Sequence, residues 1–185
     1  MNIVVLTASG KVIVRPDTTW ERDNEDAFLP EFVSAVTCSP VLTARVCKPG
    51  RSVGVKFAER YYDCVGSGVL LYPENLMDGS AEGYACASCL DHTSFIPMPT
   101  GSKESIDGAS IKLSADGMEL VCINGLDRQA ICRAIAEVTR FCYIRIGDII
   151  AVELGDRKPL ALQCPGRMHI AADGLGEASD FNVIL

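Results

Sequence analysis

The chain has 185 residues, of which 48% are hydrophobic and 22% charged, so it has enough apolar material for one core and is not globally disordered. This length predicts a single domain over residues 1–185. The net charge is −7 and no run of basic residues is present, so we expect neither nucleic acid nor an anionic membrane as a partner.

The N-terminal part of the chain is typical of β-structure. Asn2–Thr7 and Val12–Arg15 are short β-rich runs that predict a hairpin. The first run is short and has no leading positive charge, so it is predicted to be a strand and not a signal peptide. The polar segment Pro16–Glu31 is expected to be irregular, with Trp20 and Phe28 as anchors in the core.

Two strands are predicted in the next part of the chain. Val41–Cys47 is the first, and Gly68–Tyr72 is the second. Between them, Val53–Cys64 is compatible with either a helix or a strand. The triplet at residues 66–68, Gly-Ser-Gly, lacks the third glycine and the following helix of a phosphate-binding loop, so a turn is predicted there.

The C-terminal half contains the strongest helical pattern. Ile106–Leu113 and Met118–Ile123 flank an Asp-Gly pair, which predicts a second hairpin. Apolar residues recur at helical spacing over Asp127–Phe141, and the strand Ile149–Leu154 follows. The chain is therefore predicted to be α+β and mainly β, with one principal helix.

Two groups of residues carry possible chemistry on their own. Cys86 and Cys89 have the spacing of a metal or redox pair, but there is no second pair to complete a zinc site. Asp91, His92 and Ser94 are the residue types of a hydrolytic triad, yet triad members normally converge from separate elements. Nine cysteines without a secretory signal indicate reduced thiols and a cytoplasmic protein.

Five segments occur in the order found in one family of enzymes. The chain resembles the fumarylacetoacetate hydrolase family, which includes decarboxylases and isomerases of dicarboxylic keto acids. The resemblance implies a mixed β-roll of that type and a homodimer. It also implies that the family's N-terminal lid segment is absent from this chain. The segments are VRPDTTW from Val14, AFLPEF from Ala27, LTARV from Leu42, KFAERYYDCVGSGV from Lys56 and RIGDII from Arg145.

The same resemblance identifies the positions of a metal site. The family holds Mg²⁺ or Mn²⁺ on a Glu-x-Glu pair and an Asp, and the metal polarises a dioxo substrate. Here the Glu-x-Glu pair falls on Ser39 and Val41, and the Asp falls on Leu70. A family lysine that helps to hold the substrate falls near Ser88. Because Mg²⁺ requires hard oxygen ligands, these residues predict that no metal is bound.

Three hypotheses for the function follow. The first is a protein of this fold that has lost metal binding and catalysis and keeps a structural, binding or regulatory role. The alternative is a divergent hydrolase, decarboxylase or isomerase of a dicarboxylic keto acid, with Mg²⁺ or Mn²⁺ on Glu74, Asp91 or Glu153. A third, weaker hypothesis is a redox or metal module on Cys86 and Cys89.

Overall fold

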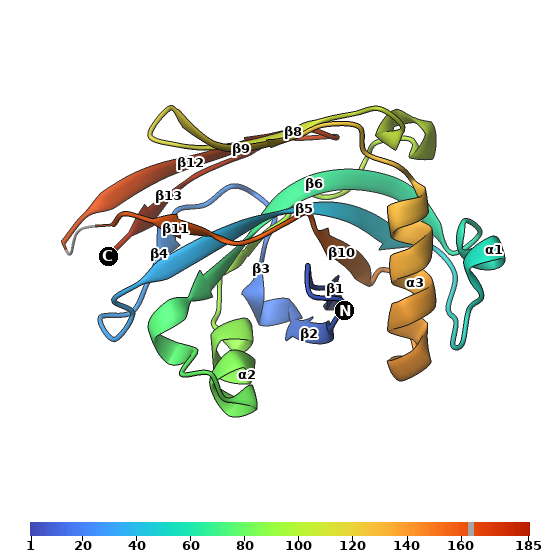
Figure 1. Ribbon diagram of the computed structural model, residues 1–185, viewed down its shortest axis with the longest axis horizontal. Coiled ribbons are helices and arrows are strands. Elements are labelled where there is room, and N and C mark those ends of the chain that lie inside the picture. Colours follow the sequence, from blue (N-terminus) through green and yellow to red (C-terminus); the bar gives the residue numbers. More distant parts are fainter. Residues whose placement is uncertain (163–164) are drawn as a thin grey trace.

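The structure is a computed structural model that describes residues 1–162 and 165–185. Its strands form two sheets, and Figure 1 shows the smaller sheet lying over the long central strands of the larger one. The strands are β1 (Asn2–Leu6), β2 (Val12–Pro16), β3 (Trp20–Glu21), β4 (Ala27–Phe28), β5 (Val36–Val46), β6 (Tyr62–Pro73), β7 (Ser94–Phe95), β8 (Ile111–Ala115), β9 (Met118–Ile123), β10 (Ile149–Glu153), β11 (Lys158–Leu160), β12 (Arg167–Asp173) and β13 (Ser179–Ile184).

The larger sheet has the strand order β2-β1-β10-β5-β6-β7-β3, with β11 also paired to β5. It is mixed, because β1 pairs with β10 in parallel and β5 pairs with β6 in antiparallel orientation. The smaller sheet has the order β4-β13-β12-β8-β9. The prediction of an α+β, mainly β fold with a mixed β-roll is therefore confirmed.

The central pair of strands is longer than the sequence predicted. The Gly-Ser-Gly triplet lies inside β6, so the predicted turn is wrong. Glycine is needed there because neighbours approach the backbone: a Cβ on Gly68 would lie 2.6 Å from the carbonyl oxygen of Phe95. The ambiguous segment Val53–Cys64 contains the short helix α1 (Val55–Ala58), after which β6 begins.

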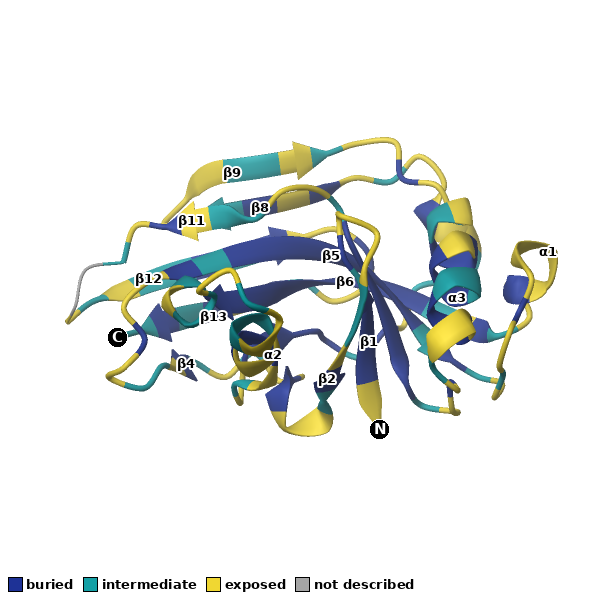
Figure 2. Ribbon diagram, turned by 60° about the horizontal axis from the view of Figure 1, so that its bottom comes forward, coloured by how far each residue is buried: buried dark blue, intermediate teal, exposed yellow. Residues whose placement is uncertain are grey.

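Side chains alternate across β5 and β6 and supply separate hydrophobic clusters. Cys38 and Leu71 face the smaller sheet. Val41 and Leu70 instead pack with residues of β1 and β10 inside the roll. Figure 2 shows that these central strands are buried along most of their length.

Helices cover two places on the roll. The principal helix α3 (Gln129–Phe141) closes one end and buries Ile131, Ile135 and Val138, as its spacing predicted (Figure 1). The second helix, α2 (Ala81–Cys89), was not predicted, because its apolar residues show almost no helical periodicity. Its N-cap is Ser80, whose side chain accepts a hydrogen bond from the Gly83 amide.

Both predicted hairpins are confirmed, and one predicted anchor is wrong. β1 and β2 pair in antiparallel orientation, as do β8 and β9. Trp20 is buried, and its Nε1 donates to the carbonyl oxygen of Ile96 over 2.7 Å. Phe28, however, is 74% exposed, because β4 is a two-residue edge strand that turns this side chain outward. None of the helices in residues 1–162 and 165–185 is long and apolar enough to cross a membrane.

Candidate binding site

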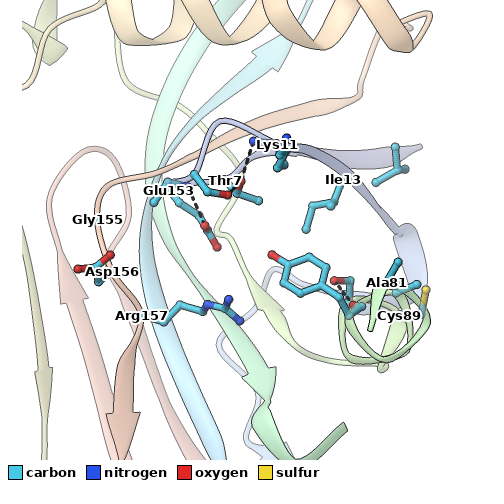
Figure 3. Close-up of a pocket in the computed structure, with 15 residues that line it drawn as sticks. Thr7, Lys11, Ile13, Ala81, Cys89, Glu153, Gly155, Asp156 and Arg157 are labelled. Carbon is cyan, nitrogen blue, oxygen red and sulfur yellow. Dashed lines mark hydrogen bonds between the residues drawn. The ribbon is translucent and has the colours of Figure 1, made fainter. Parts of the chain in front are cut away.

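A cavity of about 570 Å³ lies between the β1–β2 turn, helix α2 and the loop from β10 to β11. Thr7 and Lys11 come from the turn, Tyr84 from α2, and Glu153 and Arg157 from the third side. Figure 3 shows the side chains of Glu153 and Arg157 pointing into this space. The cavity is therefore assembled from three segments that are distant in the sequence.

The carboxylate of Glu153 is held at the base of the cavity. Its Oε1 accepts a 2.6 Å hydrogen bond from the Tyr72 hydroxyl, and its Oε2 accepts a 3.0 Å hydrogen bond from the Ala8 amide. Glu153 ends β10 and is buried. Burial raises the pKa of Tyr72 well above its ordinary value, so its phenol stays a neutral donor.

Two guanidinium groups lie over the ring of Tyr72. The Cζ atom of Arg15 is 4.4 Å from the ring centroid, and that of Arg157 is 4.7 Å from it. Arg157 also lies 5.4 Å from the centroid of the Tyr84 ring. Cation–π attraction of this kind is strongest where the cation is desolvated, so it favours the buried Arg15 most.

Arg15 is an internal cation. Its Nη1 donates to the carbonyl oxygen of Thr93 and to Oγ of Ser94, both over 2.9 Å, and its Nη2 donates to the carbonyl oxygen of Leu71 over 2.7 Å. Burial lowers the pKa of Arg15. No carboxylate of the described residues lies within ion-pair distance of the Arg15 guanidinium. Its charge is therefore stabilised by carbonyl and hydroxyl dipoles and by the Tyr72 ring.

The three positions that the resemblance assigns to a metal lie together in the sheet. Ser39 is directly opposite Leu70, and Val41 is directly opposite both Gly68 and Glu153. Ser39, Val41 and Leu70 are completely buried. The structure thus brings these residues to one patch of the interior, below the cavity.

The residues at this patch do not fit Mg²⁺ or Mn²⁺. Both ions need an array of hard oxygen ligands, and Val41 and Leu70 present only alkyl groups. The buried Oγ of Ser39 has no hydrogen-bond partner among residues 1–162 and 165–185, but a single neutral hydroxyl is a weak ligand. Within the described part of the chain, no three Asp, Glu, His or Cys side chains are grouped closely enough to hold a metal ion.

The alternative acidic candidates do not converge. Glu153 lies in the cavity wall, whereas Asp91 is exposed beyond the end of α2. Glu74 accepts a hydrogen bond from Thr37 Oγ1 and lies 3.4 Å from Nη1 of Arg157. Each carboxylate therefore has its own surroundings, and the three do not form one ligand set.

Ser88 and one cysteine of the Cys-x-x-Cys pair lie at the cavity. Ser88 lines it from α2, but its Oγ donates a 2.8 Å hydrogen bond to the carbonyl oxygen of Tyr84. Cys89 also lines the cavity, and both it and Cys86 are exposed free thiols. The structure places no histidine or acidic ligand set with the pair in the described residues.

The Asp-His-Thr-Ser segment does not form a triad. Nδ1 of His92 lies 3.2 Å from Oε2 of Glu21, away from the serine. Ser94 instead accepts a hydrogen bond from Arg15. His92 and Ser94 therefore make separate structural contacts, and the expectation that this segment forms no triad is confirmed.

Of the polar residues that define the site, the sequence analysis named Glu153 as a candidate but not Arg15, Tyr72 or Arg157. Arg15 had a usable signal, because it is a charged residue at the end of an apolar run. Tyr72 also had one, since it lies two residues after Leu70 and so shares its face of the strand. Arg157 had none, because it lies in a loop whose position depends on tertiary packing.

Comparison with known proteins identifies the fold. No protein-family model matches the sequence, and no curated protein matches it either. Among solved structures, a fumarylpyruvate hydrolase from Pseudomonas aeruginosa, in complex with Mn²⁺ and pyruvate, superposes with a TM-score of 0.83 at 14% identity. The match covers 100% of this chain and 90% of that one.

Two further solved structures have the same fold as this chain. A 2-hydroxyhepta-2,4-diene-1,7-dioate isomerase from Mycobacterium marinum has a TM-score of 0.83 at 14% identity, with coverage of 99% of this chain and 74% of that chain. A protein from Yersinia pestis, described as of the fumarylacetoacetate hydrolase family, has a TM-score of 0.82 at 17% identity, with 99% and 92% coverage. The chain therefore has the fold of fumarylacetoacetate hydrolase-type hydrolases and isomerases.

Proposed function

We propose that this chain is a protein of the fumarylacetoacetate hydrolase fold that has lost metal binding and catalysis and has kept its cavity as a binding site. The observation that carries the proposal is the buried patch of Ser39, Val41 and Leu70, which offers a metal one neutral hydroxyl and two alkyl groups. A single cytoplasmic domain that forms a homodimer belongs to the same proposal.

The replacement has a physical advantage for a protein without a metal. Three carboxylates gathered in the interior repel one another unless a cation neutralises them. Burial of a Val or Leu side chain instead stabilises the folded state by about 1.5–3 kcal/mol. Val41 and Leu70 therefore support the roll at positions where acidic side chains would need a bound ion.

The polar groups of the cavity are suited to binding more than to proton transfer. Both carboxylate oxygens of Glu153 already accept hydrogen bonds, so this group is not a free general base. Arg157 is fixed over two aromatic rings and can present its remaining donors to a ligand. Lys11 supplies a second positive charge from the opposite segment.

A melting experiment with divalent cations tests the proposal. The melting temperature of the purified chain should not change between zero and millimolar Mn²⁺ or Mg²⁺. The matched control is the triple variant S39E/V41E/L70D, which restores the carboxylates; where it folds, Mn²⁺ should stabilise it. Saturable stabilisation of the unmodified chain would instead favour the alternative, a metal-dependent hydrolase, decarboxylase or isomerase of a dicarboxylic keto acid.

A further inference from the structure

One end of the molecule carries several exposed apolar side chains. This end, called here the α1–α3 end, comprises residues 48–60 and 133–146. The two segments are joined by paired hydrogen bonds between Gly50 and Ile144 and by the Ser52 amide, which donates to the carbonyl oxygen of Thr139. Five large apolar side chains on it are between 44% and 68% exposed: Val55, Phe57, Phe141, Tyr143 and Ile146.

The same end has a surplus of positive charge, although the chain has a net charge of −7. Within the described residues, only Arg140 among its exposed cations forms an ion pair, with Glu137. The other acidic residue here, Glu59, is paired with Arg128 next to this end. Six exposed cations are left without a carboxylate partner in the described part of the chain: Lys48, Arg51, Lys56, Arg60, Arg133 and Arg145.

Cations and apolar groups alternate on this surface. Nζ of Lys56 lies 4.9 Å from the ring centroid of Phe57, and Cζ of Arg60 lies 5.7 Å from it. Arg145 and Ile146 are adjacent and both exposed. Figure 1 shows α1 and its flanking turns protruding beyond α3, so Val55 and Phe57, which belong to α1, lie on a projecting part of this end.

We infer that the α1–α3 end docks on an anionic lipid surface. Lys and Arg side chains near such a surface are attracted by its negative potential. Apolar side chains on protruding turns gain from entering the boundary between headgroups and acyl chains. Both features are present together here, and neither the cavity nor the proposed function is involved.

Other binding partners fit the α1–α3 end less well than a lipid surface does. A nucleic acid would use the cations and could stack on Phe57, but it gains little from the aliphatic Val55 and Ile146. A symmetric dimer through this end would bring two positive surfaces together, which is unfavourable. An anionic lipid surface attracts the cations and also accepts the aliphatic side chains.

The acidic character of the whole chain does not prevent this contact. At physiological ionic strength, charges separated by more than about 8 Å are largely screened, so local charge decides the interaction. The sequence predicted no membrane partner because neither segment is a basic run. The fold gathers cations from two segments that are about 90 residues apart.

Vesicle sedimentation tests the inference. At 0.1 M salt, the chain should sediment with vesicles of phosphatidylcholine and phosphatidylserine and remain in solution with phosphatidylcholine alone. Each removed cation should lower the partition coefficient about fivefold, so K56A/R60A should lower it about 25-fold. Ile146→Ser should also weaken binding to the same vesicles, since its side chain is one of the exposed apolar groups.

Matched controls separate this surface from general effects. K112A/R167A removes two exposed cations from β8 and β12, and Met118→Ser removes an exposed apolar group from β9. Both controls should bind like the unmodified chain, and all variants should keep its melting temperature. The inference is wrong if the unmodified chain stays in solution with the anionic vesicles, if K56A/R60A sediments equally well, or if the chain binds a single-stranded oligonucleotide and no vesicle.

Discussion

The hydroxyl of Tyr72 donates a 2.6 Å hydrogen bond to Oε1 of Glu153, and this contact joins β6 to β10 across the intervening strand β5. The Glu153 carboxylate is thereby fixed at the base of the cavity. The same tyrosine ring carries the guanidinium groups of Arg15 and Arg157. Tyr72 is therefore the residue through which the charged groups of the site are connected.

Removal of this hydroxyl should destabilise the fold. Tyr72→Phe leaves Oε1 of Glu153 buried without its donor, and a hydrogen bond to a charged group contributes about 1.5–3 kcal/mol. Urea unfolding should show a loss of free energy in this range. The control Tyr143→Phe, at an exposed position, should change it by less than about 0.5 kcal/mol. Equal unfolding free energies for the two variants would contradict this role of Tyr72.

The stability of the chain should fall at alkaline pH through the same tyrosine. Burial raises the pKa of Tyr72 in the folded state above its unfolded value of about 10. A raised pKa contributes stability that is fully present below pH 10 and is lost as the pH rises toward the folded pKa. The unfolding free energy should decrease by up to about 1.4 kcal/mol per pH unit above pH 10 through this group.

The variant Tyr72→Phe isolates that contribution. Its unfolding free energy should fall less steeply above pH 10 than that of the unmodified chain. Some dependence should remain, because burial also raises the pKa of Tyr84. Parallel pH profiles for the two proteins would show that Tyr72 does not titrate differently in the folded and unfolded states.

Introduction of a single carboxylate at Leu70, one of the three positions that the resemblance assigns to a metal, should lower the free energy of unfolding. Leu70 is completely buried, so Leu70→Asp places an ionisable group in the interior next to other apolar residues. We expect a loss of several kcal/mol in unfolding free energy, measured with urea. Leu70→Met, which keeps the volume and polarity, should cost less than about 1.5 kcal/mol. A tolerated Leu70→Asp would mean that this patch is more polar or hydrated than its packing indicates.

The glycines inside β6 should be intolerant of a side chain. A Cβ on Gly68 would lie 2.6 Å from the Phe95 carbonyl oxygen, which belongs to the backbone of a paired strand and cannot easily move. Gly68→Ala should therefore lower the unfolding free energy by about 1–3 kcal/mol. At Gly54, where the nearest group lies 3.8 Å away, the same substitution should have a smaller effect. Similar losses at both positions would contradict the close approach.

Local patterns in the sequence predicted much of the fold. The Asp116-Gly117 pair specifies its hairpin because both residues adopt positive φ, at 47° and 76°. The spacing of Ile131, Ile135 and Val138 specified α3. The turn predicted at the Gly-Ser-Gly triplet was wrong, because glycine permits both a turn and a close approach of strands. Only tertiary packing decides between these two structures.

The candidate site was predictable only in part. The resemblance assigned Ser39, Val41 and Leu70 to one metal site, and the register of β5 and β6 does bring the three residues together. The charged network above them was not predicted, because Arg15 and Arg157 are separated by about 140 residues and meet only at the Tyr72 ring. Contacts of this kind leave no local signal in a single sequence.

The most direct test of the central claim is a titration of the purified chain with Mn²⁺ followed by electron paramagnetic resonance. The six-line signal of the free aqueous ion should equal that of a protein-free solution at every ratio, because Ser39, Val41 and Leu70 offer no ligand set. A loss of free signal that saturates at one ion per chain would contradict the proposal that the metal site has been lost.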